Sequence, residues 1–163
     1  MIYLYERNKT GICVNRVFGY DGIVEIPDTL NGFPVTELGA YLFSDHIDAS
    51  ELNKKKETGS YCTENGTEEI PTDDMPQAAG NKVEEIRLPR FLRKIGRYAF
   101  YNCFQLRRLK FYGKMKDLGA GALTGCHKME QITVETDENG QSALRDFLTE
   151  LPETLRVDMK TDG

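Results

Sequence analysis

The chain has 163 residues, of which 39% are hydrophobic and 29% charged, and it contains no tryptophan. This composition is typical of a soluble domain and excludes wholesale disorder. No apolar run approaches the roughly 20 residues of a membrane helix, and the first residues lack a basic leader. We therefore expect a cytoplasmic protein if Met1 is the native start, and a secreted or cell-surface protein if a signal peptide has been removed.

The net charge of -5 is distributed unevenly along the chain. Residues 1–44 carry a net charge of -2, residues 45–81 carry -6, residues 82–116 carry +9 and residues 117–163 carry -6. The basic band 82–116 has two interpretations. Either it binds an anionic partner, or it is a solvated surface whose charge is offset by the acidic neighbours.

Four predicted strands follow one another along the chain. The first is residues 23–27, and three further strands begin at Val83, Leu106 and Met129, 23 residues apart. These three read apolar-x-x-apolar-x-apolar, the pattern of leucine-rich-repeat strands. Alternate residues of a strand point to opposite faces, so we expect six side chains to point inward and build one core: Ile86, Leu88, Leu109, Phe111, Ile132 and Val134.

A second element repeats between the strands. Residues 35–43, 92–103 and 115–126 share apolar positions three and four apart, with a glycine at the same place in each. The spacing predicts a short helix or a single turn, and Gly96 and Gly119 are expected to permit a sharp bend.

Residues 45–81 interrupt this repeat. Leu38 and Ile95 occupy equivalent positions but are 57 residues apart instead of 23. The extra segment is acidic, poor in apolar residues and punctuated by Gly and Pro, which predicts a long projecting loop. Such a loop is either part of a binding face or an idle excursion.

The motif IxLPxxLxxIGxxAFxxC, residues 86–103, resembles the BspA-like leucine-rich repeat found mainly in host-associated bacteria. The resemblance implies an α/β fold class, namely a short solenoid with one parallel strand per repeat, a β-hairpin-like N-terminal cap, a role in binding proteins or matrix, and often a cell-surface setting. From residue 143 to residue 151 the apolar spacing predicts a helix that belongs to a C-terminal cap. We expect a single domain, 1–163, divided into cap strands 1–22, repeats 23–44 and 82–134, an acidic insertion 45–81 and a C-terminal cap 135–163.

The four cysteines are expected to be structural. Cys103 and Cys126 occupy equivalent repeat positions, where parallel side chains would make a strained bridge, so buried free thiols are predicted. A bridge between Cys13 and Cys62 stays open, because the repeat fixes neither residue.

No sequence pattern indicates catalysis, a cofactor or a metal. His46 and the pair Cys126-His127 lack the paired spacing of zinc ligands. The glycines of GAGALTG run G-x-G-x-x-x-G, which is not the dinucleotide fingerprint, and no hydrolase or kinase signature is present. We therefore predict no catalytic residue, no cofactor and no metal site, and expect that the protein is not an enzyme.

The outward positions of the strands are the predicted partner-binding face. This face contains Glu85, Arg87, Arg108, Lys110, Tyr112, Gln131 and Thr133. Its basic side chains predict a patch that binds an unknown, acidic protein partner. The function expected is therefore a non-catalytic protein-protein interaction module. The alternative, nucleic-acid or other polyanion binding through residues 82–116, is disfavoured by the acidic chain and the few aromatic residues of the band.

Overall fold

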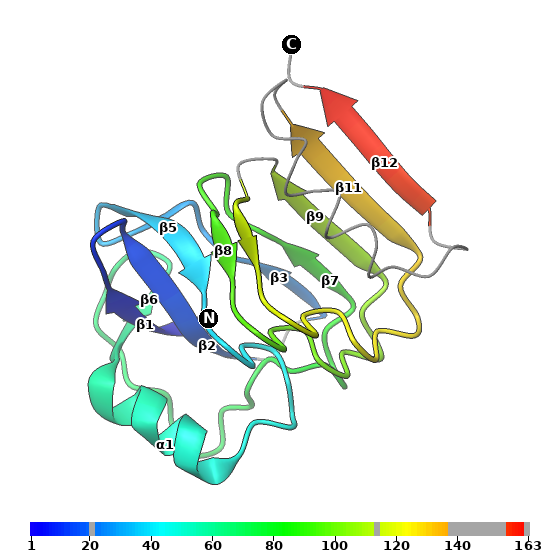
Figure 1. Cartoon of the computed structure of the whole chain (residues 1–163). Coiled ribbons are helices and arrows are strands. Elements are labelled where there is room, and N and C mark those ends of the chain that lie inside the picture. Colours follow the sequence, from blue (N-terminus) through cyan, green and yellow to red (C-terminus); the bar gives the residue numbers. More distant parts are fainter. Residues whose placement is uncertain (20–21, 113–114, 137–155, 162–163) are drawn as a thin grey trace.

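The computed structural model describes residues 1–19, 22–112, 115–136 and 156–161. Two sheets dominate these residues (Figure 1). The repeat sheet has the order β12-β11-β9-β7-β3 and is parallel throughout. Its strands are β3 (Ile23–Glu25), β7 (Glu85–Arg87), β9 (Arg108–Tyr112), β11 (Gln131–Thr136) and β12 (Arg156–Thr161).

The second, N-terminal sheet has the order β10-β8-β5-β2-β1-β6, with β4 added to β5. Its strands are β1 (Ile2–Arg7), β2 (Ile12–Phe18), β4 (Thr29–Leu30), β5 (Phe33–Leu38), β6 (Ser60–Thr63), β8 (Lys94–Ile95) and β10 (Asp117–Leu118). The antiparallel pair β1–β2 is the strand pair expected in residues 1–22. In the described part of the chain no helix is long and apolar enough to cross a membrane.

The register of the repeat sheet confirms the repeat inferred from the sequence. Val24, Ile86, Leu109 and Ile132 pair in one row across β3, β7, β9 and β11. All four side chains are buried, because alternate residues of each strand face the core. The leucine-rich-repeat-like fold with its parallel sheet is therefore present.

The second element of each repeat is a strand followed by a turn, so of the two alternatives, a short helix or a single turn, the structure has the turn. Leu38, Ile95 and Leu118 pair in parallel across β5, β8 and β10. The chain then reverses through left-handed residues at the equivalent positions Tyr41 (φ 59°) and Tyr98 (φ 55°). Because a left-handed residue cannot continue a right-handed helix, the turn ends there.

Gly96 has a different role from the one the sequence indicated. It is not among the residues with positive φ. A Cβ atom on Gly96 would lie 2.6 Å from the backbone nitrogen of Ala40 and 2.8 Å from the carbonyl carbon of Gly39. The glycine is required because successive coils stack backbone against backbone.

The insertion 45–81 is folded, which corrects the prediction of a long projecting loop. It contains α1 (Ala49–Thr58), the only helix in the described residues, and β6, which pairs antiparallel with β1. Asp48 caps α1 by accepting a hydrogen bond from the Glu51 backbone at 2.7 Å. The helix has few apolar residues, so the sequence shows no hydrophobic face there.

A buried lysine holds α1 against the N-terminal sheet. Lys55 Nζ donates hydrogen bonds to the carbonyl oxygens of Asn15, at 3.0 Å, and of Ala40. Burial, together with the positive charge of Arg16, lowers the pKa of Lys55 to about 8. The helix is therefore docked mainly through polar contacts to backbone, which no hydrophobic pattern reveals.

One hydrophobic cluster joins both sheets. It runs from Ile12 and Val14 of β2, through Phe43 and Phe100, to Ile132 and Val134 of β11. The rings of Phe43 and Phe100 stack with centroids 5.8 Å apart. A continuous core of this kind agrees with one domain, although the boundaries given above stay predictions.

At the C-terminal end, β12 pairs in parallel with β11 over residues 131–136. This strand, β12, lies within the predicted C-terminal cap 135–163 and extends the repeat sheet by one strand. The helix predicted for residues 143–151, and with it the C-terminal helix cap, lies outside the described residues.

Candidate binding surface

The structure brings the seven predicted face residues together on the repeat sheet. Glu85, Arg108 and Gln131 form one cross-strand row, and Arg87, Lys110 and Thr133 form the next. Tyr112 pairs with Glu135 in a third row. All seven lie on the side opposite the buried row, because they alternate with core residues along each strand.

The face is mixed in charge rather than basic. Arg87 Nε lies 3.3 Å from Glu85 Oε1, and Arg108 Nη1 lies 4.0 Å from Glu85 Oε2. Lys110 Nζ lies 2.8 Å from Glu135 Oε1, and this hydrogen bond raises the pKa of Lys110. Because carboxylates lie among the basic side chains, the face is not the simple basic patch expected.

Sequence reasoning missed two acidic members of this face. Glu25 pairs with Arg87 across β3 and β7, although the insertion separates these residues in sequence. Glu135 follows Thr133 by two residues, as Tyr112 follows Lys110. The alternation of inward and outward side chains, continued two residues beyond Thr133, identifies Glu135. The same alternation applied to the first predicted strand, residues 23–27, identifies Glu25.

The basic side chains of the face nevertheless remain accessible. The exposed fractions of the side chains are 50% for Arg87, 58% for Arg108 and 36% for Lys110. Tyr112 lies beneath two of the cations of this region, with its ring centroid 5.6 Å from Lys110 Nζ and 5.7 Å from Arg90 Cζ. The face thus offers charged groups of both signs around an aromatic ring.

A hollow of about 550 Å³ continues the face beyond its first strand. It lies where β1 approaches β3, and the Tyr3 hydroxyl donates a hydrogen bond to the Glu25 carbonyl at 3.1 Å. Ile23, which is 47% exposed, contributes an apolar side chain to its lining. The other residues lining it are Met1, Tyr3, Glu25, Pro27, Glu64 and Arg87. No sequence pattern indicated it, because it is made by segments distant in the sequence.

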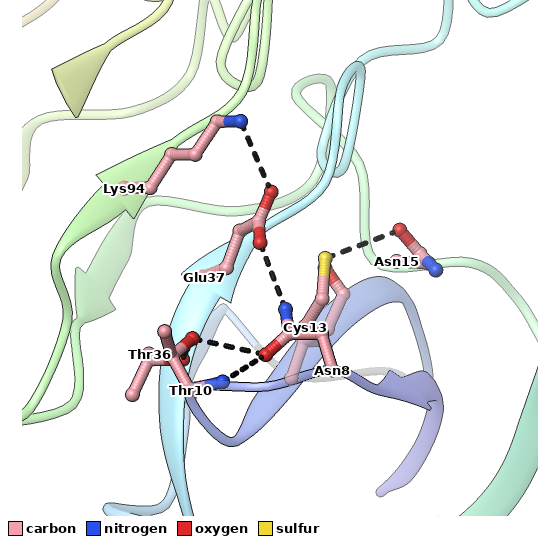
Figure 2. A network of polar contacts seen from close by, with 8 residues as sticks. Asn8, Thr10, Cys13, Asn15, Thr36, Glu37 and Lys94 are labelled. Atoms are coloured by element: carbon pink, nitrogen blue, oxygen red, sulfur yellow. Dashed lines mark hydrogen bonds and ion pairs between the residues drawn. The ribbon is translucent and has the colours of Figure 1, made fainter.

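Only some of the described basic residues of the band 82–116 lie on the repeat-sheet face. Outside the repeat sheet, Arg97 pairs with Glu51 of α1 at 2.9 Å, and Lys94 pairs with Glu37 of β5 at 3.5 Å. Figure 2 shows Glu37 held between Lys94 and Asn8, whose Nδ2 donates to Glu37 Oε2 at 3.0 Å. Several basic residues of the band therefore pair with acidic residues of other segments, as its solvated interpretation expects.

The cysteines are free thiols in structural positions. Cys103 and Cys126 are buried, and their sulfur atoms donate to the carbonyl oxygens of Phe43 and Phe100, one coil back, at 3.4 and 3.1 Å. Cys103 and Cys126 are therefore the buried free thiols that the sequence predicts. Cys13 and Cys62 are free as well, and they lie on β2 and β6, on opposite sides of β1.

We predict that no thiol of the folded protein reacts rapidly. Burial, with the charge of Glu37 as a further cause, raises the pKa of Cys13 to about 12, and burial raises that of Cys126 to about 12. Since only the thiolate reacts, a shift of this size slows modification about a thousandfold relative to the unfolded chain. Titration with a chromogenic disulfide reagent at mildly alkaline pH, with and without guanidinium, measures the ratio. One fast-reacting thiol in the folded protein would contradict the prediction, and Cys13→Ser would identify it as Cys13.

Among the described residues, neither histidine belongs to a group of side chains that could bind a metal ion. His46 Nε2 lies 2.9 Å from Asn102 Nδ2, and His127 is exposed while its neighbour Cys126 is buried. Across the described ranges, no group of three or more His, Cys, Asp or Glu is placed to hold a metal ion.

Comparison with known proteins gives one family and two similar structures. Residues 78–147 match the family model of the BspA type Leucine rich repeat region (6 copies). A leucine rich cell surface protein from Faecalibacterium prausnitzii A2-165 is 16% identical, with a TM-score of 0.51, over 98% of this chain. The T. pallidum Leucine Rich Repeat protein is 17% identical, with a TM-score of 0.32, over 98% of this chain and 80% of its own. No curated protein matches the chain.

The chain spans 41% of the length of the Faecalibacterium protein. At 16% identity this similarity establishes the leucine-rich-repeat-like fold alone.

Proposed function

Because the chain carries a BspA-type leucine-rich repeat region at residues 78–147, we propose that it is a non-catalytic protein-protein interaction module that presents the face of its repeat sheet. The observation that carries the proposal is the row arrangement of Glu85, Arg87, Arg108 and Lys110 on neighbouring parallel strands. The pleated backbone fixes the spacing of these charges, so a partner with matching charges meets a preformed pattern.

The mixed charge of the face refines the expected partner. A uniformly acidic protein would meet Glu25, Glu85 and Glu135 as well as the basic side chains. A partner that presents both signs of charge fits this face better. The dispersal of the basic band, and its pairing with Glu37 and Glu51, supports a protein partner over the polyanion alternative.

We also propose the finer architecture and the setting. The stacked coils are a short solenoid closed at one end by the β1–β2 hairpin, since that hairpin extends the N-terminal sheet beyond β5. The Faecalibacterium protein is described as a cell surface protein. By analogy of fold alone, a cell-surface setting is our choice over the cytoplasmic one.

The test is a pulldown from a lysate of the source cell. It compares three forms of the purified protein: wild type, a face variant and a matched control. The face variant carries Arg87→Glu, Arg108→Glu and Lys110→Glu. The matched control carries Arg93→Glu, Lys116→Glu and Lys128→Glu, three exposed positions away from the face with the same change in charge. We expect the face variant to recover at least about tenfold less of one protein than wild type, whereas the control recovers the same amount.

Two further measurements separate the alternatives. Recovery that disappears after nuclease treatment would support polyanion binding instead. Equal recovery by all three forms would show that the face is not the binding site. Thr133→Trp, which blocks the face without changing its charge, tests the same surface if the face variant melts at a lower temperature than wild type.

A further inference from the structure

A second hollow, of about 300 Å³, lies away from the repeat-sheet face and shares no residue with it. It is bounded by β2, α1 and residues at both ends of the insertion 45–81. The residues that line it are Arg16, Asp45, Ile47, Leu52, Gln77, Asn81 and Lys82.

Arg16 is a buried cation at this hollow. It is 3% exposed, and its Nη1 donates to the carbonyl oxygens of Tyr41, Leu42 and Ser44 at 2.7, 2.9 and 3.0 Å. Its Nε donates to Gln77 Oε1 at 2.6 Å. The hydrogen bonds between described residues use Nε and Nη1, and none of them uses Nη2. The guanidinium is therefore fixed in place, and no acceptor among the described residues uses its Nη2.

Within residues 1–19, 22–112, 115–136 and 156–161, no carboxylate forms an ion pair with Arg16. Burial lowers the pKa of Arg16 to about 10, and the nearby charge of Asp45 opposes this shift. Asp45 is itself exposed. Burying a cation without an ion-pair partner raises the free energy of the folded state. An anion bound beside the cation would lower that free energy.

From the buried guanidinium, the Nη2 that no described acceptor uses and the hollow before it, we infer that Arg16 binds a carboxylate ligand. Lys82, which is exposed, adds a second positive charge to the lining, and the Asn81 amide adds a donor. Ile47 and Leu52 provide apolar wall beside the carboxylate. The carboxylate belongs either to a small free acid or to an acidic side chain of a partner protein.

Asp45 is the natural competitor for this ligand. It lines the same hollow and carries the charge that acts on Arg16. A ligand carboxylate must therefore displace or tolerate Asp45, and Asp45→Asn should strengthen binding. Lys82→Gln should weaken it, because it removes an attractive charge.

The experiment is a titration of the full chain with sodium acetate, followed by ¹⁵N-resolved NMR, against sodium chloride at equal ionic strength. We expect saturable shifts of the Arg16 Nε–H and of the Gln77 and Asn81 side-chain amides with acetate alone. Asp45→Asn should lower the acetate Kd about threefold and Lys82→Gln should raise it about threefold, the size of a screened charge contribution. Lys128→Gln, exposed and outside the hollow, should leave it unchanged.

A peptide arm identifies the source of the carboxylate. Acetyl-Gly-Asp-Gly-amide binding at the same resonances more tightly than acetate indicates an acidic side chain, and weaker binding indicates a small free acid. Shifts that are absent, that chloride reproduces, or that neither Asp45→Asn nor Lys82→Gln alters would overturn the inference and leave Arg16 as a purely structural tether of residues 41–44. None of these outcomes depends on the repeat-sheet face, whose own test is the partner capture described above.

Discussion

Gly96→Ala is expected to lower the free energy of unfolding by about 3 kcal/mol, because a methyl group at this position enters the space of the neighbouring coil. The added Cβ would lie 2.6 Å from Ala40 N and 2.8 Å from Gly39 C. Both atoms are backbone of the adjacent coil and cannot move aside as a side chain would. Relief requires β5 and β8 to separate, which weakens their parallel pairing. For a chain of this length the melting temperature should fall by about 6 to 12 °C.

Gly22→Ala is the matched control for this substitution. The nearest atom to a Cβ on Gly22 is Glu84 Oε2, at 4.0 Å, and Gly22 is not among the glycines with positive φ. Its alanine variant should have a stability equal to or slightly above that of wild type, since alanine reduces the entropy of the unfolded chain. Chemical denaturation of both variants measures the difference. Similar stabilities would contradict the close stacking of coils at Gly96.

Phe100→Ala is expected to destabilise the protein by about 3 to 5 kcal/mol. Phe100 is fully buried and stacks on Phe43, so its truncation removes both the buried ring and the contact between two successive coils. The cost includes the cavity that remains, because the parallel strands on either side cannot collapse into it.

Phe104→Ala provides the comparison within the same repeat. Phe104 is 43% exposed, so its truncation should cost less than about 1 kcal/mol. Urea denaturation of the two variants measures both free energies of unfolding. They can be compared directly if the slope of the free energy with urea concentration is the same in both variants. If Phe104→Ala were the more damaging change, the assignment of the inward and outward sides of this turn would be wrong.

The sequence determined the repeat and the inward face of the repeat sheet. The 23-residue spacing of Val83, Leu106 and Met129 places Ile86, Leu109 and Ile132 in one buried row, and the structure has that row. It also identified Leu38 and Ile95 as equivalent positions across the insertion, and these residues are paired in β5 and β8. Such features follow from local periodicity, because side chains that alternate along a strand must bury the same face in every coil.

Three features were decided only by tertiary structure. Helix α1 of the insertion is tied to the N-terminal sheet by Lys55, which donates to backbone carbonyls of Asn15 and Ala40, and those acceptors have no signature in the sequence. Face residues from different repeats form ion pairs, as Arg108 does with Glu85, so their charges offset each other only when the strands are side by side. The hollow at Arg16 is bounded by residues from 16 to 82. Periodicity records which way a side chain points, whereas its partners depend on segments that only the folded chain brings together.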